Sequence, residues 1–123
     1  MGLGPEARPE LPRQLIELMD DSESTHVSVV SIYEIAQKVR LGKWPEMEAA
    51  AGSLASLLVE QGYVGVDVTG AISQMAGLLE WDHRDPFDRM IAATAIQLQT
   101  PLISADEAFD ALSDRKDWPG RVW

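Results

Sequence analysis

The sequence predicts an α/β fold in which helices flank a parallel sheet. Short β-branched segments alternate with longer segments whose apolar residues recur at helical spacing, and no segment between two strands has the composition of a hairpin turn. The chain has 123 residues, of which 46% are hydrophobic and 24% charged, and this suits one domain with one core. We therefore expect residues 1–123 to fold as a single α/β domain.

The first half of the chain is expected to form three helices and a strand. Apolar residues at helical spacing predict a helix over 5–20, and the β-branched run 26–30 predicts a buried strand. Ser31 then opens a second helix, which Gly42 ends. A third helix is expected over about 46–61.

The second half is expected to alternate strands with helices. The expected elements are a strand over 63–68, a helix capped by Thr69, a helix over 86–99, a strand at 102–103, a short helix ending at Leu112 and an edge strand over 121–123. The helix over 86–99 has the strongest pattern, and its expected buried stripe contains Phe87, Met90, Ile91, Thr94 and Leu98.

Composition limits the classes of function. Cysteine is absent, which excludes disulfides and thiolate metal sites and favours a reducing compartment. The sequence shows no secretory signal and no apolar stretch that could span a bilayer, so we expect a cytoplasmic protein with no membrane partner. The net charge of −10 argues against a general basic nucleic-acid surface. The negative charge is compatible with three alternatives: clustered acids that hold divalent cations, a basic partner peptide, or a partner other than nucleic acid.

Four acids follow predicted strands or open the helices after them: Glu34, Asp85, Asp88 and Asp106. Ligands of a parallel sheet bind beyond the carboxyl ends of its strands, so at least Glu34 and Asp106 are expected at one edge. Carboxylates that converge repel one another, and a divalent cation relieves this repulsion. Mg²⁺ or Mn²⁺ takes oxygen ligands and activates water toward phosphate esters.

Each acid also has a local explanation. Ser31 and Glu34 have the spacing of a capping box, Asp85 and Asp106 suit helix N-caps, and Asp88 suits a first helical turn. Taken singly, capping is the better explanation of each. Capping and metal binding are compatible, because a carboxylate has a second oxygen to offer, and several acids at one edge favour the metal.

Few other residues suggest a catalytic or metal-binding role. His83 lies beside Asp82 and Asp85, so one interpretation makes it a metal ligand or a base. The other interpretation is a solvated loop histidine, which is the more frequent case for a lone histidine in a loop. The motifs HExxH, GxSxG, GxxxxGK[ST] and GxGxxG are all absent, which argues against a zinc hydrolase, a serine hydrolase of the GxSxG kind, a phosphate-loop protein and a dinucleotide binder.

Three segments resemble those of VapC-type PIN toxins and occur in that family's order. Residues 27–43 begin VSVVSIYEIAQK and end in LGK, residues 83–92 read HRDPFDRMIA, and residues 102–109 read LISADEAF. The second segment is the most specific, and the final Val122–Trp123 also matches a frequent ending of the family. The resemblance covers the chain from about residue 5 to its end.

The resemblance implies a PIN-like three-layer α/β/α sandwich with a parallel sheet and a metal-dependent ribonuclease site. Mg²⁺ or Mn²⁺ would be held by Glu34, Asp85, Asp88 and Asp106, of which Glu34, Asp88 and Asp106 are the catalytic acids. Ser104 would be the hydroxyl residue beside the metal. The implied partners are an RNA substrate, a cognate antitoxin whose tail blocks the site, and a second copy in a homodimer. Independently of the resemblance, Arg89 flanks the acidic start of the helix over 86–99, and we expect it to touch an RNA phosphate or to pair with an acid of the site.

The sequence departs from the family at its start. The family opens with a central strand that ends in an acid, whereas residues 1–8 resemble the stretch that follows that strand. We therefore expect an N-terminally truncated domain that lacks the first strand and the first catalytic acid, with weakened activity. Asp20 and Asp21 are no substitutes, because they end a predicted helix. Three alternative explanations of the missing strand are open, in this order of preference: a start assigned too late, a truncated gene, or a strand supplied by another chain.

Two other functions stay open. A non-catalytic PIN-fold module that binds an antitoxin is favoured by the missing acid and disfavoured by the four acids retained. A phosphoacceptor domain with clustered acids would want a lysine after a late strand, which the sequence lacks.

Overall fold

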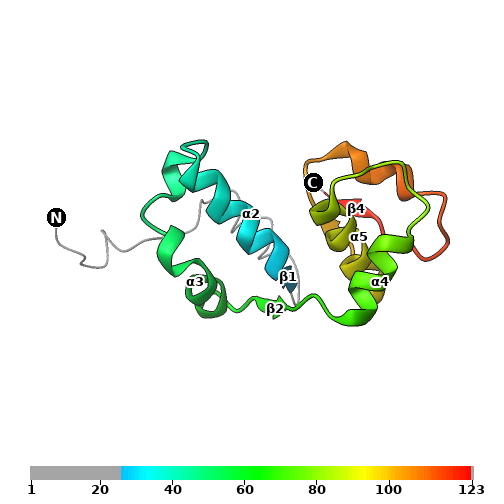
Figure 1. Cartoon of the computed structure of the whole chain (residues 1–123). Coiled ribbons are helices and arrows are strands. Elements are labelled where there is room, and N and C mark those ends of the chain that lie inside the picture. Colours follow the sequence, from blue (N-terminus) through cyan, green and yellow to red (C-terminus); the bar gives the residue numbers. More distant parts are fainter. Residues whose placement is uncertain (1–25, 123) are drawn as a thin grey trace. The chain divides into compact units, whose positions relative to one another are not determined.

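A computed structural model describes residues 26–122 (Figure 1). These residues have a mixed α/β structure divided between two compact units. The first unit contains residues 26–27 and 31–65, and the second contains residues 28–30 and 66–122. The predicted helix over 5–20, and the residues 1–8 on which the predicted truncation depends, lie outside the described residues.

The first unit opens with a strand that is shorter than predicted. β1 (His26–Ser28) pairs with β2 (Val64–Val66) in a two-stranded sheet, and the helix α2 (Val29–Arg40) begins directly after β1. Ser28 Oγ accepts a hydrogen bond from the backbone N–H of Val30 at 3.1 Å, so this serine serves the first turn of the helix. The prediction that Ser31 opens the helix is therefore wrong.

The end of α2 is where the sequence predicts it. Gly42 has a φ of 73°, in the left-handed region. Its N–H donates to the carbonyl of Val39 at 2.9 Å, and the N–H of Lys43 donates to the carbonyl of Lys38 at 2.9 Å. This pair of bonds is the Schellman motif, which satisfies the last carbonyls of a helix and favours glycine.

The predicted helix over 46–61 is divided into three pieces. These are the 3₁₀ helices η2 (Pro45–Met47) and η3 (Ala51–Ser53) and the helix α3 (Leu54–Glu60). Gly52 lies within the interrupted stretch, where its low helix propensity disfavours a continuous helix. The buried apolar residues of this segment include Met47, Leu54, Leu57 and Leu58.

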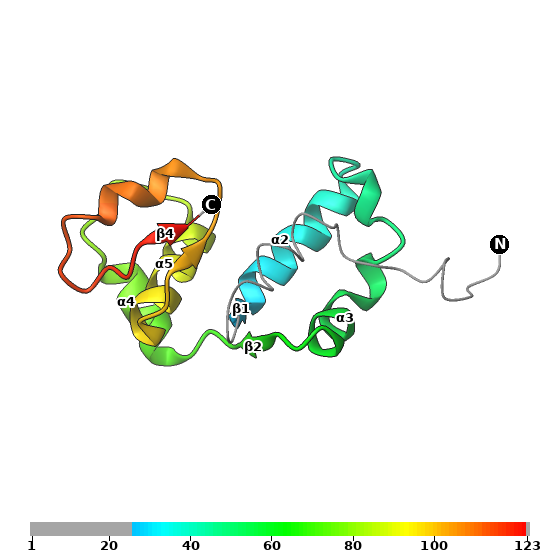
Figure 2. The ribbon, with the colours of Figure 1, turned by 180° about the vertical axis from the view of Figure 1, so that it is seen from behind.

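The second unit is built on two packed helices, α4 (Gly70–Leu78) and α5 (Pro86–Leu98), which lie side by side in both views (Figures 1 and 2). Thr69 caps α4, as predicted, because its Oγ1 accepts from the N–H of Ile72 at 3.1 Å. Small residues at the contact, Ala76 and Ala93, are almost fully buried and let the two helices approach closely.

The buried face of α5 differs from the predicted stripe. Thr94 is buried as expected, but Leu98 is 38% exposed. The buried residues of the helix are Ala92, Ala93, Thr94, Ala95 and Ile96. Ala92 and Ile96 pack with Leu79, Phe109 and Leu112 in the larger core cluster of the unit. Ala92 is buried because Phe109 and Leu112 pack with it, and Ala93 is buried because Ile72 and Ala76 of α4 pack with it.

A parallel strand pair follows α5. β3 (Leu102–Ile103) pairs with β4 (Arg121–Val122), with Leu102 opposite Arg121, and the 3₁₀ helix η4 (Glu107–Leu112) lies between them in sequence. Both predicted strands are thus confirmed. Among residues 26–122 the strands form two separate pairs, so the three-layer sandwich stays a prediction. No helix in this part of the chain is long and apolar enough to cross a membrane.

Candidate metal centre

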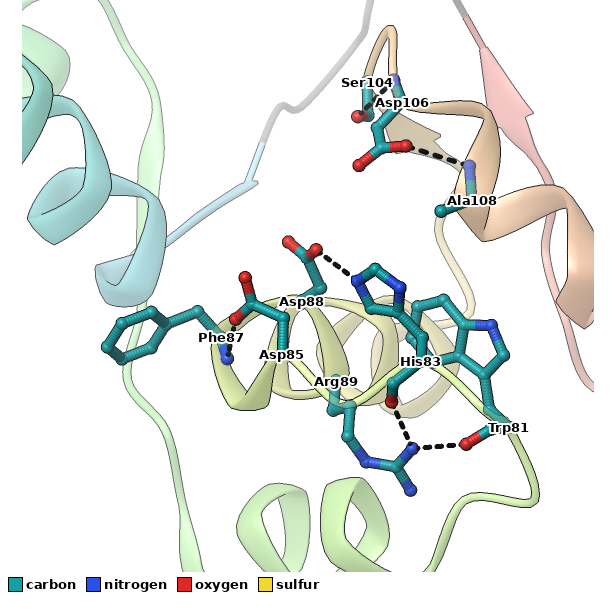
Figure 3. Close-up of polar contacts among 9 residues, drawn as sticks. All are labelled: Trp81, His83, Asp85, Phe87, Asp88, Arg89, Ser104, Asp106 and Ala108. Carbon is teal, nitrogen blue, oxygen red and sulfur yellow. Dashed lines mark hydrogen bonds and ion pairs between the residues drawn. The ribbon is translucent and has the colours of Figure 1, made fainter.

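Two of the predicted metal ligands lie at the start of α5. Asp85 is the N-cap, and its Oδ1 accepts from the backbone N–H of Phe87 at 2.9 Å. Asp88 lies in the first turn, with its side chain 17% exposed. The two carboxylates each have an oxygen within 4.8 Å of the other, and both lie on the same side of the helix end (Figure 3).

The local sequence accounts for this arrangement. Pro86 suits the first helical position, because a helix leaves that N–H unbonded and proline has none. The positive end of the helix dipole attracts both carboxylates. Capping engages Oδ1 of Asp85 and leaves Oδ2 as a potential ligand. The predicted capping roles of Asp85 and Asp88 are therefore confirmed, and they are compatible with metal binding.

His83 contacts one of these acids. Its Nε2 lies 2.6 Å from Oδ2 of Asp88, and its ring stacks on Trp81 with centroids 4.7 Å apart and planes inclined by 22°. The histidine side chain is 29% exposed. His83 is thus bound to an acid of the site, and the interpretation of a merely solvated loop histidine is wrong.

Arg89 faces away from the acids. Its Nε donates to the carbonyl of Ala76 at 2.9 Å, and its Nη2 donates to the carbonyl of Leu79. Its Nη1 donates to the carbonyls of Trp81 and His83, at 2.7 and 2.9 Å (Figure 3). Four of its five N–H groups thus bond to carbonyls of α4 and of the loop that follows it. The expected pairing of Arg89 with an acid is not found among the described residues, and the expected phosphate contact stays a prediction.

Asp106 follows β3 and caps η4. Its Oδ1 accepts from the N–H of Ala108 at 2.9 Å, and its own N–H donates to Ser104 Oγ at 3.1 Å. The predicted capping role is confirmed. The carboxylate is exposed and is turned toward the start of α5 (Figure 3). Within the second unit the structure thus brings Asp85 and Asp88 together, whereas Asp106 does not belong to a group of ligand atoms within 4.8 Å of one another among the described residues, and its metal-binding role stays a prediction.

The fourth predicted ligand, Glu34, lies on α2 in the first unit and is partly buried. Since α2 begins at Val29, Ser31 is inside the helix and cannot form a capping box with Glu34. That local explanation of Glu34 is wrong. Its metal-binding role, and the sheet edge that it is expected to share with Asp106, stay predictions.

An ion pair that the sequence did not suggest supports the Asp106 turn. Nε and Nη2 of Arg121 bond to the two carboxylate oxygens of Asp110 at 2.9 and 2.7 Å, and Nη1 donates to the carbonyl of Ser104 at 3.0 Å. The hydrogen bonds from Arg121 hold the pKa of Asp110 below its usual value of 3.8. Arg121 and Asp110 lie 11 positions apart in the sequence, and their ion pair joins η4 to β4. A local sequence pattern therefore could not predict it.

The chain matches a known family. A family model of the PIN domain matches residues 3–114, a range that includes all four predicted ligands and most of both units. Among curated proteins and among solved structures, none matches the chain.

Proposed function

The chain belongs to the PIN domain family, a nuclease fold, and from this premise we propose that it is a metal-dependent endoribonuclease of the VapC toxin kind. The observation that carries the proposal is the pair of carboxylates at the start of α5, within 4.8 Å of each other inside the segment HRDPFDR. Acids brought this close repel one another unless a cation or a proton lies between them.

The residues fit Mg²⁺ or Mn²⁺. Asp85, Asp88 and Asp106 offer carboxylate oxygens, which are the ligands that these cations prefer, and the chain has no cysteine to select a softer metal. We propose that Glu34 completes the set, on the strength of its place in the segment VSVVSIYE. When bound, the cation would polarise a phosphoryl oxygen and activate a water for hydrolysis of the RNA phosphodiester bond.

The chain's own residues prepare the site in two ways. The N–H of Phe87 fixes the carboxylate of Asp85, and that of Ala108 fixes the carboxylate of Asp106, before any ligand arrives. Ligands held in this way lose little conformational entropy on binding. A chain of net charge −10 repels RNA, so cations held by these acids would also lower the electrostatic barrier to phosphate approach.

The finer attributes rest on the resemblance in the three motif segments. We propose that the complete fold is the three-layer α/β/α sandwich, that the protein is a cytoplasmic homodimer, and that a cognate antitoxin covers the acids.

Cleavage of RNA by the purified 123-residue chain in Mn²⁺ tests the function. Asp88→Asn removes a ligand charge with little change of shape, and Asp114→Asn is the matched control at an exposed site on the same unit. We expect cleavage that EDTA abolishes, that Asp114→Asn retains, and that Asp88→Asn lowers by about 100-fold.

Cleavage that survives in Asp88→Asn would refute the assignment of the site. If the chain binds Mn²⁺ through Asp88 but cuts none of the RNAs supplied, the non-catalytic antitoxin-binding module takes its place.

A further inference from the structure

We propose that His83 is a positioning residue that orients the Asp88 carboxylate for cation binding, and that Trp81 and Arg89 hold His83 in place. The inference rests on the proposed function and gives a role to a residue of the HRDPFDR segment other than its acids.

The contact between His83 and Asp88 is short and partly shielded from water. Nε2 lies 2.6 Å from Oδ2, and the Asp88 side chain is 17% exposed. A carboxylate cannot donate when ionised, so Nε2 carries the proton and Oδ2 accepts. A hydrogen bond to a charged, partly buried acceptor is stronger than one in water. It limits rotation of the carboxylate and leaves Oδ1 for a cation.

This geometry argues against coordination of a cation through Nε2. A metal ligand must present an unprotonated nitrogen to the cation, whereas Nε2 of His83 is engaged with Asp88. Coordination through Nε2 would require this bond to break. Acids that ligate metals are commonly held by such hydrogen-bonded neighbours, which fix their orientation.

The His83 ring packs against aromatic residues of the second unit. It stacks on Trp81, and Trp81 packs on Phe109 with centroids 5.6 Å apart. Phe109 is 3% exposed and stacks in turn on Trp118 at 6.4 Å. A row of aromatic rings therefore connects the His83 imidazole to the core of the second unit, and stacking on Trp81 restrains the ring beside Asp88.

The histidine backbone is fixed as well. Nη1 of Arg89 donates both to the carbonyl of His83 and to that of Trp81. Arg89 is the residue after Asp88 on α5, so the same helical turn carries the acid and the group that holds the loop. The ring and the backbone of His83 are thus both set before a cation binds, which lowers the entropy cost of forming the site.

Two substitutions separate the hydrogen bond from the stacking. His83→Phe keeps a ring for Trp81 but has no donor, whereas His83→Gln keeps an N–H at similar reach but has no ring. Binding of Mn²⁺ to the full chain is measured by titration calorimetry, with thermal unfolding to confirm that each variant folds. We expect His83→Phe to raise the Kd for Mn²⁺ by about 10–100-fold and His83→Gln to restore it to within about threefold of the unsubstituted chain.

The outcomes are distinct. Unchanged Mn²⁺ affinity in His83→Phe, or equal weakness of the folded Phe and Gln variants, would overturn the positioning role. Asp88→Asn, titrated in parallel, tests the metal centre itself: unchanged Mn²⁺ affinity there would refute the proposed function and not only the role of His83. If His83→Phe does not fold, ¹⁵N NMR of the unsubstituted chain still decides, because an Nε2 without a proton contradicts the proposed hydrogen bond.

Discussion

Arg89 is expected to be a major source of stability in the second unit. Its guanidinium donates to four backbone carbonyls, of Ala76, Leu79, Trp81 and His83. A hydrogen bond contributes about 0.5–1.5 kcal/mol net, so four of them contribute about 2–6 kcal/mol. Ordering the long side chain costs about 2 kcal/mol, and water can reach some of these partly buried carbonyls when the side chain is removed.

We therefore expect Arg89→Ala to lower the free energy of unfolding by about 2–3 kcal/mol, measured by urea denaturation. The matching fall in Tm is about 8–15 °C for a chain of this size. Arg89→Lys should recover less than half of the loss, because one ammonium group cannot reach carbonyls spread over eight residues. Arg84→Ala, at an exposed arginine of the same loop, is the control and should change the free energy by less than about 0.5 kcal/mol. If Arg89→Ala is as stable as Arg84→Ala, the four bonds do not hold the loop.

Three further predictions concern local structure. Gly42→Ala should cost about 1 kcal/mol in urea unfolding because Gly42 has a positive φ, whereas Gly52→Ala, with equally open space and no positive φ, should not destabilise the chain; equal effects would contradict the reasoning. Thr69→Ala should cost about 1 kcal/mol and Thr69→Ser much less, and a stable alanine variant would show that the cap of α4 contributes nothing. The pKa of Asp110, followed by NMR, should lie below 3.8 and rise in Arg121→Met. Since this folded-state pKa is depressed, the stability that the pair contributes is present above the unfolded pKa and is lost as pH falls through the folded one. The stability difference between the two chains should therefore shrink in acid, and a difference that grows there would refute the pairing.

The acids of the site show how much of the chemistry local sequence carries. Asp85, Asp88 and Asp106 were predicted both as helix-start residues and as ligands, and each is found at the start of its helix. Glu34 shows the limit of the same reasoning. The spacing of Ser31 and Glu34 fits a capping box, but Ser28 bonds to the N–H of Val30 and the helix starts earlier.

The sequence by itself determined the features that depend on contacts within a few residues. The Gly42 turn, the Thr69 cap and the Asp–Pro start of α5 follow from backbone geometry and from nearby hydrogen bonds, which neighbouring residue types largely decide. The order and specificity of the three motif segments likewise identified the PIN family, which the match over residues 3–114 confirms.

Only the tertiary structure decided what the cationic and aromatic side chains do. Arginine donates equally well to a phosphate, a carboxylate or a carbonyl, and the packing of α4 against α5 places carbonyls around Arg89. His83 binds Asp88 because a core of Trp81, Phe109 and Trp118 supports its ring from behind. The carbonyl of Ala76 and the rings of Phe109 and Trp118 come from elements outside the HRDPFDR segment that folding brings together, so local spacing does not encode these contacts.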